Sequence, residues 1–315
     1  MRMRLEGQRV LVTGANGFIG SHLCLRLCQE GAEVHAVYRS RRPAGPGDRH
    51  WWQADLADFA AVKDIIHKTR PEVIFHLASH VKGAPDLQYV LPTFHSNLQS
   101  TVNLLTVAAD SNCHRVILTG SLTEPDAESG ELFPTAPYAA AKWASSGYAR
   151  MFHALYKLPV LIARVFMVYG PGQMDLTKLI PYATVSLLQR RTPKISSGER
   201  LVDWIYVSDL VSGFMAMAQA PDMDGATVDL GSGSLVSIRD IVQRLALSIG
   251  GNANINFGAL PDRPLEPTRA AKTAETLSKI GWKPQISLQE GLERTVDWYR
   301  RSLEHSADIY QSILA

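Results

Sequence analysis

The chain has 315 residues, of which 46% are hydrophobic and 20% charged, enough to bury one large core or a core with a smaller lobe. Its 32 basic and 30 acidic residues give a formal net charge of +2, so charge offers no reason to expect nucleic acid or an anionic membrane as a partner. The N-terminus carries charges without a following apolar segment, and Arg164 interrupts the apolar run over residues 158–170. We therefore expect a soluble, cytoplasmic protein.

Apolar runs of strand length alternate with longer segments of helical period in the first half of the chain. Strands are predicted over residues 10–13, 34–38, 73–78, 115–119 and 159–164, and helices over 18–30, 98–109 and 138–156. Short apolar strands separated by helices pair in parallel and are buried on both faces. The pattern predicts an α/β fold with a Rossmann-type, doubly wound parallel sheet.

Beyond residue 165 the alternation loosens into prolines, glycines and short helices. We expect residues 1–165 to form the dinucleotide-binding domain, with residues 201–230 returning to it. Residues 166–200 and 231–315 then form a smaller C-terminal substrate-binding lobe.

Three cysteines, Cys24, Cys28 and Cys113, are few and odd in number. Cys24 and Cys28 lie one helical turn apart within an apolar pattern, so we expect buried thiols rather than a disulfide or a metal pair. No histidines fall at metal-ligand spacing, and no metal site is expected.

The first candidate motif is Thr13-Gly-Ala-Asn-Gly-Phe-Ile-Gly20, "TGANGFIG", which joins a predicted strand to a predicted helix. In that position Gly14 makes the turn, Gly17 lets a pyrophosphate approach the backbone, and Gly20 allows close helix packing. Three glycines at this spacing also occur in plain tight turns. The strand-turn-helix setting favours a dinucleotide site.

The second strand ends in Tyr38, Arg39 and Ser40, where NAD enzymes of this fold carry an acid that binds the ribose 2′-hydroxyl. An acid would repel a 2′-phosphate, whereas the Arg39 guanidinium can bind one and stack on adenine. Ser40, Arg41 or Arg42 can add contacts, although arginines also decorate solvated loops. We therefore expect NADP as the cofactor, with NAD the less favoured alternative.

A second constellation combines Ser121 with Tyr138 and Lys142. Residues four apart share a helix face, so Lys142 can lie beside Tyr138, lower the pKa of its phenol and reach a ribose. Tyr138 would then exchange a proton near neutral pH while Ser121, close behind a predicted strand, holds a substrate oxygen. This spacing also occurs in surface helix pairs, but after a glycine-rich turn, four strands and a strand-terminal serine that is the weaker explanation.

At this point the chain resembles the extended short-chain dehydrogenase/reductase family, and in particular its nucleotide-sugar epimerases, dehydratases and reductases. The resemblance covers nearly the whole chain through "TGANGFIG", "HLAS" (76–79), "HSNLQST" (95–101), "YAAAK" (138–142), "ARVFMVYGPG" (163–172), "DWIYVSDLV" (203–211) and "GWKPQISLQEGL" (281–292). It implies redox chemistry with NAD(P) at a hexose carbon of a nucleotide sugar, bound by the smaller lobe.

The family pattern also implies the roles of individual residues. The predicted catalytic residues are Ser121, Tyr138 and Lys142, and Ser121, Arg200 and Arg263 are predicted to bind substrate. The predicted cofactor-binding residues are Gly14, Asn16, Gly17, Phe18, Ile19, Gly20, Arg39, Ser40, Asp55, Leu56, Leu77, Ala78, Asn97, Tyr138 and Lys142.

Departures from the family pattern narrow the reaction. Dehydratases of the family carry acids directly after the residue matching Ser121, but Leu122 and Thr123 stand there, and Glu124 is one residue out of register. Val202 replaces an expected diphosphate-binding arginine, for which Arg200 can substitute. The segment between Ser121 and Tyr138 is also short for this branch, which implies an unusual substrate.

Three functions follow. The leading one is an NADP(H)-dependent reductase of a 4-keto-(6-deoxy)hexose of an NDP-sugar, and the alternative is an NAD(P)-dependent nucleotide-sugar 4-epimerase. A non-catalytic NADP-binding protein is a distant third, because such a protein need not keep the proton donor Tyr138. The sequence leaves the nucleotide base, the sugar and the product stereochemistry open.

A homodimer is expected through a four-helix interface, because family members commonly pair two long helices with their copies. The corresponding helices here span residues 98–109 and 138–156. The second carries small residues that allow close approach, namely Ala139, Ala140, Ala141, Ala144, Ser145 and Ser146. The same face could instead pack on the chain's own sheet.

Overall fold

The computed structural model describes residues 4–40, 49–126, 130, 133–251, 254–263 and 266–305, and the chain forms two compact units. The first unit comprises Met1–Val165, Val211–Leu230 and Ala274–Trp282, and the second comprises Phe166–Leu210, Gly231–Thr273 and Lys283–Ala315. Residues 201–230 do not return to the first unit as one block, because residues 201–210 belong to the second. Residues 274–282, which the sequence assigned to the smaller lobe, join the first unit instead.

A seven-stranded sheet in the order β3-β2-β1-β4-β5-β6-β9 forms the first unit, and every neighbouring pair is parallel. Its strands are β1 (Arg9–Thr13), β2 (Glu33–Tyr38), β3 (Arg49–Gln53), β4 (Val73–His76), β5 (Arg115–Ser121), β6 (Val160–Val165) and β9 (Thr227–Leu230). The order reverses between β1 and β4, and ligands bind beyond the carboxyl ends of the strands at such a reversal. The predicted doubly wound fold is confirmed.

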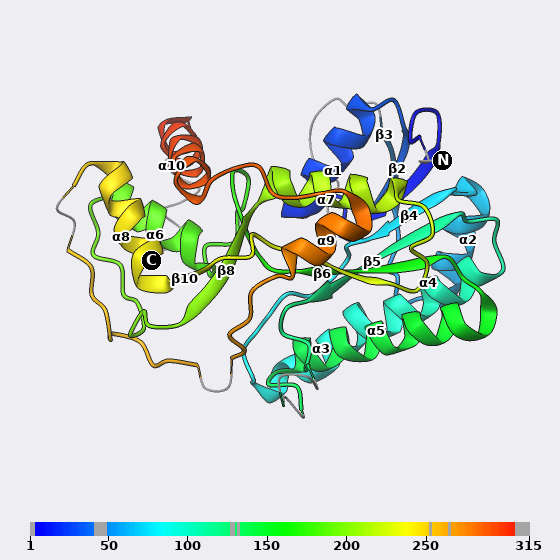
Figure 1. Cartoon of the computed structure of the whole chain (residues 1–315), viewed down its shortest axis with the longest axis horizontal. Coiled ribbons are helices and arrows are strands. Elements are labelled where there is room, and N and C mark those ends of the chain that lie inside the picture. The colour runs from blue at the N-terminus through cyan, green and yellow to red at the C-terminus, as the bar shows by residue number, and fades with distance from the viewer. Residues whose placement is uncertain are drawn as a thin grey trace. The chain divides into compact units, whose positions relative to one another are not determined.

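Helices cover both faces of this sheet. Figure 1 shows α4 (Ser100–Ala109) and α5 (Pro137–Tyr156) on one side, with α1 (Phe18–Gln29) and α7 (Val207–Gln219) on the other. The side of α1 that faces the sheet carries its buried residues Gly20, Leu23, Cys24 and Leu27, which follow the helical period. Because helices cover both faces, strands such as β4 are buried along their whole length.

Two elements of the first unit, β3 and α2 (Phe59–Thr69), were not predicted from the sequence. β3 reads Arg-His-Trp-Trp-Gln and is at most half-buried, so it lacks the apolar run that marks the other strands. α2 begins after Asp58, whose carboxylate accepts the N–H of Ala60 at 2.9 Å. This side-chain cap is a start signal that the sequence does carry.

The helix predicted over residues 98–109 begins earlier and irregularly. It is preceded by η1 (Leu87–Tyr89), α3 (Val90–Thr93) and the π-helical η2 (Phe94–Gln99). π-Helical turns inside helices are frequent at functional sites, and η2 contains Asn97, one of the predicted cofactor-binding residues.

The second unit packs three helices against a three-stranded sheet. The strands are β7 (Met167–Tyr169), β8 (Leu201–Tyr206) and β10 (Leu235–Ser237), and the helices are α6 (Leu179–Leu188), α8 (Ile238–Ile249) and α10 (Leu288–His305). Asp203 on β8 is buried, and its carboxylate accepts the N–H groups of Ser232, Gly233 and Ala271 at 2.7–2.9 Å. It therefore anchors two loops of this unit. The helix α9 (Thr273–Ile280) lies almost entirely in the first unit.

All three cysteines are free thiols, with Cys24 and Cys113 buried and Cys28 partly buried. Burial raises the pKa of Cys24 and of Cys113 to about 12. No helix within the described ranges has the length and apolar character needed to cross a membrane. The same residues contain no group of three His, Cys, Asp or Glu side chains arranged to hold a metal.

Candidate active site

The glycine-rich turn follows β1 at the reversal of strand order. Gly14 has a φ of +66°, and a Cβ there would lie 2.8 Å from the backbone nitrogen of Ala78. A Cβ on Gly20 would overlap the carbonyl oxygen of Gly14. Both positions therefore require glycine, the first for its conformation and the second for close packing.

The N-terminus of α1 is open to an anion. Gly17 is its N-cap and provides no side-chain hydrogen bond, and the first turn holds no acidic residue. The backbone N–H groups of this turn have no partner within the helix and point out of its end. A pyrophosphate fits this end, and the residues present therefore suit a dinucleotide.

The end of β2 carries Arg39 where an acid would bind a ribose hydroxyl. Arg39 is exposed, and its Nη1 donates to the hydroxyl of Ser96 on η2 at 3.1 Å. Gln53 holds the backbone of the same residue by donating to the Arg39 carbonyl at 3.1 Å. Arg39 thus follows the carboxyl end of β2, and its guanidinium bonds η2. Ser40 is exposed, and Arg41 and Arg42 lie outside the described residues.

Three other predicted cofactor residues differ in burial and in their hydrogen-bond partners. Asp55 is exposed, and its Oδ1 accepts the N–H of Ala57 at 3.0 Å. The side chain of Leu56 is buried in the core, and its carbonyl accepts a bond from Asn103 Nδ2 at 3.0 Å. Asn97 is also buried, and its amide bonds both the N–H and the carbonyl of His80, at 2.6 and 3.2 Å.

Ser121, Tyr138 and Lys142 come together around the end of β5. Ser121 is the last residue of β5, and Tyr138 and Lys142 lie in the first turns of α5, which begins at Pro137. The Ser121 hydroxyl bonds the Tyr138 phenol, and Lys142 Nζ lies 5.9 Å from the centre of the tyrosine ring. The structure therefore brings the three predicted catalytic residues into one site.

The electrostatics of this site differ from the sequence expectation. Burial raises the pKa of Tyr138 to about 12, the opposite of the predicted lowering, although the bond from Ser121 acts in the lowering direction. Lys142 is itself buried, and desolvation lowers its pKa to about 8. Its ammonium donates to the carbonyl and the hydroxyl of Thr119, at 2.8 and 3.1 Å, and not to the phenol.

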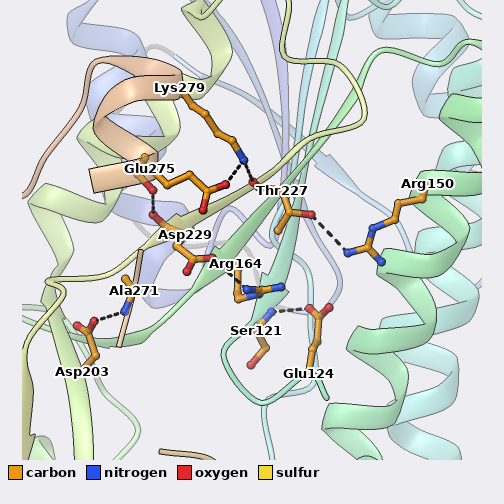
Figure 2. A network of polar contacts seen from close by, with 11 residues as sticks. Ser121, Glu124, Arg150, Arg164, Asp203, Thr227, Asp229, Ala271, Glu275 and Lys279 are labelled. Carbon is orange, nitrogen blue, oxygen red and sulfur yellow. Dashed lines mark hydrogen bonds and ion pairs between the residues drawn. The ribbon is translucent and has the colours of Figure 1, made fainter. Parts of the chain in front are cut away.

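Glu124 is a buried carboxyl group that the sequence analysis placed out of register. Its Oε1 accepts the backbone N–H of Ser121 at 2.7 Å, and its own N–H donates to the Ser121 carbonyl at 3.1 Å. Desolvation raises its pKa, while the nearby Ser146 side chain, the bond from the Ser121 N–H and the charge of Arg164 oppose this. Figure 2 shows Glu124 bound to Ser121, with the Arg164–Asp229 pair beside them.

Residues on the strand ends extend this polar network across the sheet. Arg164 on β6 and Asp229 on β9 pair at 3.3 Å, and both are at least partly buried. Thr276 of α9 donates to the carbonyl of Asp229 at 2.9 Å. Lys279 of the same helix donates to the carbonyl of Thr227 at 3.3 Å (Figure 2), so α9 covers the open edge of β9. The sequence analysis did not identify this edge, because its partners lie far apart in the chain.

The two predicted substrate arginines both lie in the second unit, where they meet a residue that the sequence analysis missed. Glu266 forms ion pairs with Arg200 and, at 3.5 Å, with Arg263. The Arg200 and Glu266 side chains are mostly buried, whereas Arg263 is exposed. Desolvation lowers the pKa of Arg200, and the Glu266 charge opposes this. Glu266 could have been proposed from its place three residues after Arg263.

The chain is similar to known proteins along most of its length. A model of the NAD dependent epimerase/dehydratase family matches residues 10–231. A UDP-glucose 4-epimerase of Mycolicibacterium smegmatis is 30% identical over 93% of this chain and 98% of its own. A dTDP-D-glucose 4,6-dehydratase of Mus musculus is 27% identical over 95% of this chain and 90% of its own.

Solved structures show the same similarity. MoeE5 in complex with UDP-glucose and NAD superposes with a TM-score of 0.83 at 30% identity, covering 93% of this chain and 99% of that chain. The protein thus resembles enzymes that act on nucleotide sugars, and this solved relative holds a nicotinamide dinucleotide.

Proposed function

The chain belongs to the NAD dependent epimerase/dehydratase family of extended short-chain dehydrogenases/reductases, and we propose that it is an NADP(H)-dependent reductase of a 4-keto-(6-deoxy)hexose carried on a nucleoside diphosphate. The observation that carries this proposal is Arg39 directly after β2, in a chain that also has Ser121, Tyr138 and Lys142 together in one site. An arginine at that position suits the 2′-phosphate of NADP, the cofactor that cells hold largely as a reductant.

In the proposed reduction each residue of the site has a separate role. A nicotinamide cofactor supplies the hydride when it is bound. Tyr138 gives its proton to the carbonyl oxygen of the sugar, and Ser121 holds that oxygen by a hydrogen bond. Burial raises the pKa of Tyr138 to about 12, so at neutral pH the phenol carries the proton that the reduction needs. Lys142 stabilises the resulting phenolate and binds the cofactor ribose.

Recognition of the diphosphate belongs to the second unit in this proposal. Arg200 and Arg263 present two guanidinium groups held together by Glu266. Paired guanidinium groups bind phosphate oxygens through charge-assisted hydrogen bonds. A nucleoside diphosphate is therefore the substrate portion that they suit.

NADPH is expected to bind more tightly than NADH, with a preference of about 1–3 kcal/mol from the phosphate-arginine interaction. Fluorescence titration of the cofactor-free protein with each nucleotide measures this. Arg39→Ala should remove the preference, while Arg26→Ala, which changes an arginine paired with Glu30 at the end of α1, should keep it. Equal affinities in the wild-type protein would overturn the NADP assignment and leave NAD, which MoeE5 binds.

Dehydration is disfavoured by the position of Glu124. Its carboxylate accepts the N–H of Ser121 and is buried, so it supports the end of β5 rather than facing a substrate. Glu124→Gln keeps an oxygen that can accept the same N–H. Its turnover should stay within about fivefold of wild type in a reductase assay, whereas loss of a general base would cost about 10²-fold or more. A loss of that size with an unchanged fold would show that Glu124 takes part in proton transfer, contradicting the structural role and removing this argument against dehydration.

A 4-epimerase is the second candidate, favoured by the 30% identity to a UDP-glucose 4-epimerase. An epimerase removes a hydride and returns it to the same carbon, so its cofactor is regenerated. NADPH carrying deuterium at the transferred position distinguishes the two reactions. A reductase places the deuterium on the sugar carbon, and an epimerase acting on a nucleotide hexose incorporates none from the added cofactor.

A homodimer is also proposed, although not through the small residues of α5. Ala139, Ala141, Ser145 and Ser146 are buried within the chain's own fold, which was the alternative left open by the sequence. Exposed apolar residues instead gather on η1, α3, η2 and α5, which pack against one another. Figure 1 shows α3 beside α5. The exposed apolar residues include Leu87, Leu91, Phe94, Trp143 and Tyr148. Such a surface suits a second copy.

Light scattering at micromolar concentration is expected to give the mass of a dimer. Trp143→Glu should shift it to a monomer, because a charge would then be buried at the interface. Leu247→Glu on α8 should not, since this exposed leucine lies outside the proposed interface. A monomeric wild-type protein would contradict the proposal.

A further inference from the structure

His76 is a fully enclosed histidine at the carboxyl end of β4, next to the reversal of strand order. It is 1% exposed, and both ring nitrogens have hydroxyl partners. Nδ1 lies 2.8 Å from the hydroxyl of Thr13, and Nε2 lies 3.0 Å from the hydroxyl of Thr101. A buried titratable group with two partners on different elements is placed to align those elements.

The direction of the first bond follows from the partners of Thr13. Its Oγ1 accepts the N–H groups of Leu77 and Ala78, both at 3.1 Å. A hydroxyl oxygen has two acceptor positions and one proton. Since both acceptor positions are used, Thr13 donates its proton to His76 Nδ1, and this nitrogen must carry none.

The second bond then has the opposite sense. With Nδ1 unprotonated, the neutral ring carries its proton on Nε2 and donates it to Thr101. Thr101 in turn donates to the carbonyl of Asn97 at 2.6 Å. A chain of hydrogen bonds, each with a fixed donor, thus runs from Thr13, directly before Gly14, through His76 and Thr101 to the carbonyl of Asn97 in the π-helical turn.

The backbone of His76 joins the same network to the catalytic lysine. The Thr119 hydroxyl donates to the His76 carbonyl at 3.0 Å and accepts from Lys142 Nζ at 3.1 Å. Burial and the charge of Lys142 lower the pKa of His76 to about 3, so the ring stays neutral throughout the working pH range. One residue therefore connects the glycine-rich turn, the 77–78 segment, the π-helical turn and Lys142.

We propose that His76 is a positioning residue for the dinucleotide, which acts in its Nε2–H form by fixing the Thr13 hydroxyl as the acceptor for Leu77 and Ala78. Those two backbone groups lie against Gly14, where a Cβ would meet the Ala78 nitrogen at 2.8 Å. The Thr13 bond therefore holds two walls of the cofactor site together. This inference rests on dinucleotide binding and not on which sugar reaction follows.

Two substitutions distinguish the hydrogen bond of His76 to Thr13 from its hydrogen bond to Thr101. In His76→Asn the side-chain oxygen can replace Nδ1 as the acceptor for Thr13, but the amide is too short to reach Thr101. In His76→Gln the amide nitrogen can replace Nε2 as the donor to Thr101, and the Thr13 bond is lost. His95→Asn, at an exposed histidine on η2, is the control.

Fluorescence titration with NADPH and NADH, together with thermal unfolding of each variant, tests the inference. His76→Asn should keep the wild-type dissociation constant within about threefold, whereas His76→Gln should weaken it about tenfold, the scale of one lost buried hydrogen bond. Equal weakening by both variants, with equal loss of Tm, would show a merely structural role and overturn the proposal.

The ring proton can also be located in the wild-type protein. Nitrogen-15 NMR of labelled histidine should show His76 Nδ1 unprotonated and Nε2 protonated, a readout that does not depend on any variant folding. Protonated Nδ1 would overturn the proposal. If the wild-type protein bound neither NADPH nor NADH, the proposed function would fail. The NMR result alone would then decide the donor and acceptor roles of the two His76 ring nitrogens.

Discussion

Tyr138→Phe is expected to lower turnover by about 10²-fold or more while the dissociation constant of the cofactor changes little. Only the phenolic hydroxyl is removed, and the ring at the start of α5 remains. In the proposed reaction this hydroxyl supplies the proton that the sugar oxygen needs. The loss should therefore appear in kcat and not in nucleotide binding.

Tyr156→Phe provides a matched control for this variant. Tyr156 is the last residue of the same helix and is exposed, so loss of its hydroxyl should leave turnover unchanged. Stopped-flow or steady-state assays on both variants, with fluorescence titration of the cofactor, make the comparison. Full activity in Tyr138→Phe would show that the tyrosine only packs.

Lys142→Met is expected to reduce both turnover and cofactor affinity, because the ammonium has two tasks. Its charge stabilises the Tyr138 phenolate, and its remaining donor capacity serves the ribose. We expect turnover to fall by about 10²-fold or more, as for loss of a group that assists proton transfer. Lys157→Met is the control, since Lys157 is exposed just beyond the end of α5.

From the lowered pKa of Lys142 we expect cofactor binding to depend on pH. Burial lowers the pKa of Lys142 to about 8 in the free protein, so the group loses its charge as the pH rises through this value. Cofactor affinity should be constant below pH 8 and fall above it, by at most about tenfold per pH unit, since one proton is involved. Affinity that does not vary with pH in the wild-type protein, or that still falls in Lys142→Met, would contradict this role.

Local patterns in the sequence were sufficient to predict the fold and the central group of the site. Glycines at 14, 17 and 20 fall between a strand and a helix, and the structure shows why Gly14 and Gly20 can carry no Cβ. Tyr138 and Lys142 are four residues apart on α5, so helical geometry alone places them on one side. These features depend on neighbours in the chain, which a sequence displays directly.

Features that depend on burial and on distant partners were not predicted. The pKa of Tyr138 rises rather than falls because the phenol loses water, and this loss cannot be read from the Tyr-Lys spacing. Glu124 accepts a hydrogen bond from the Ser121 backbone, and Glu266 forms ion pairs with Arg200 and Arg263. β3 was missed because its residues are largely polar or aromatic and only half-buried.

The consumption of reduced cofactor tests the central claim most directly. Cofactor-free protein is mixed with NADPH and, in turn, with members of a panel of 4-keto-6-deoxy nucleoside diphosphate hexoses, and the absorbance of the reduced nicotinamide is followed. Tyr138→Phe serves as the blank for non-enzymatic oxidation. A reductase will oxidise one NADPH for each molecule of one of these sugars consumed. Absorbance that stays flat while a nucleoside diphosphate hexose is converted to its C4 epimer would contradict the reductase assignment and establish the epimerase in its place.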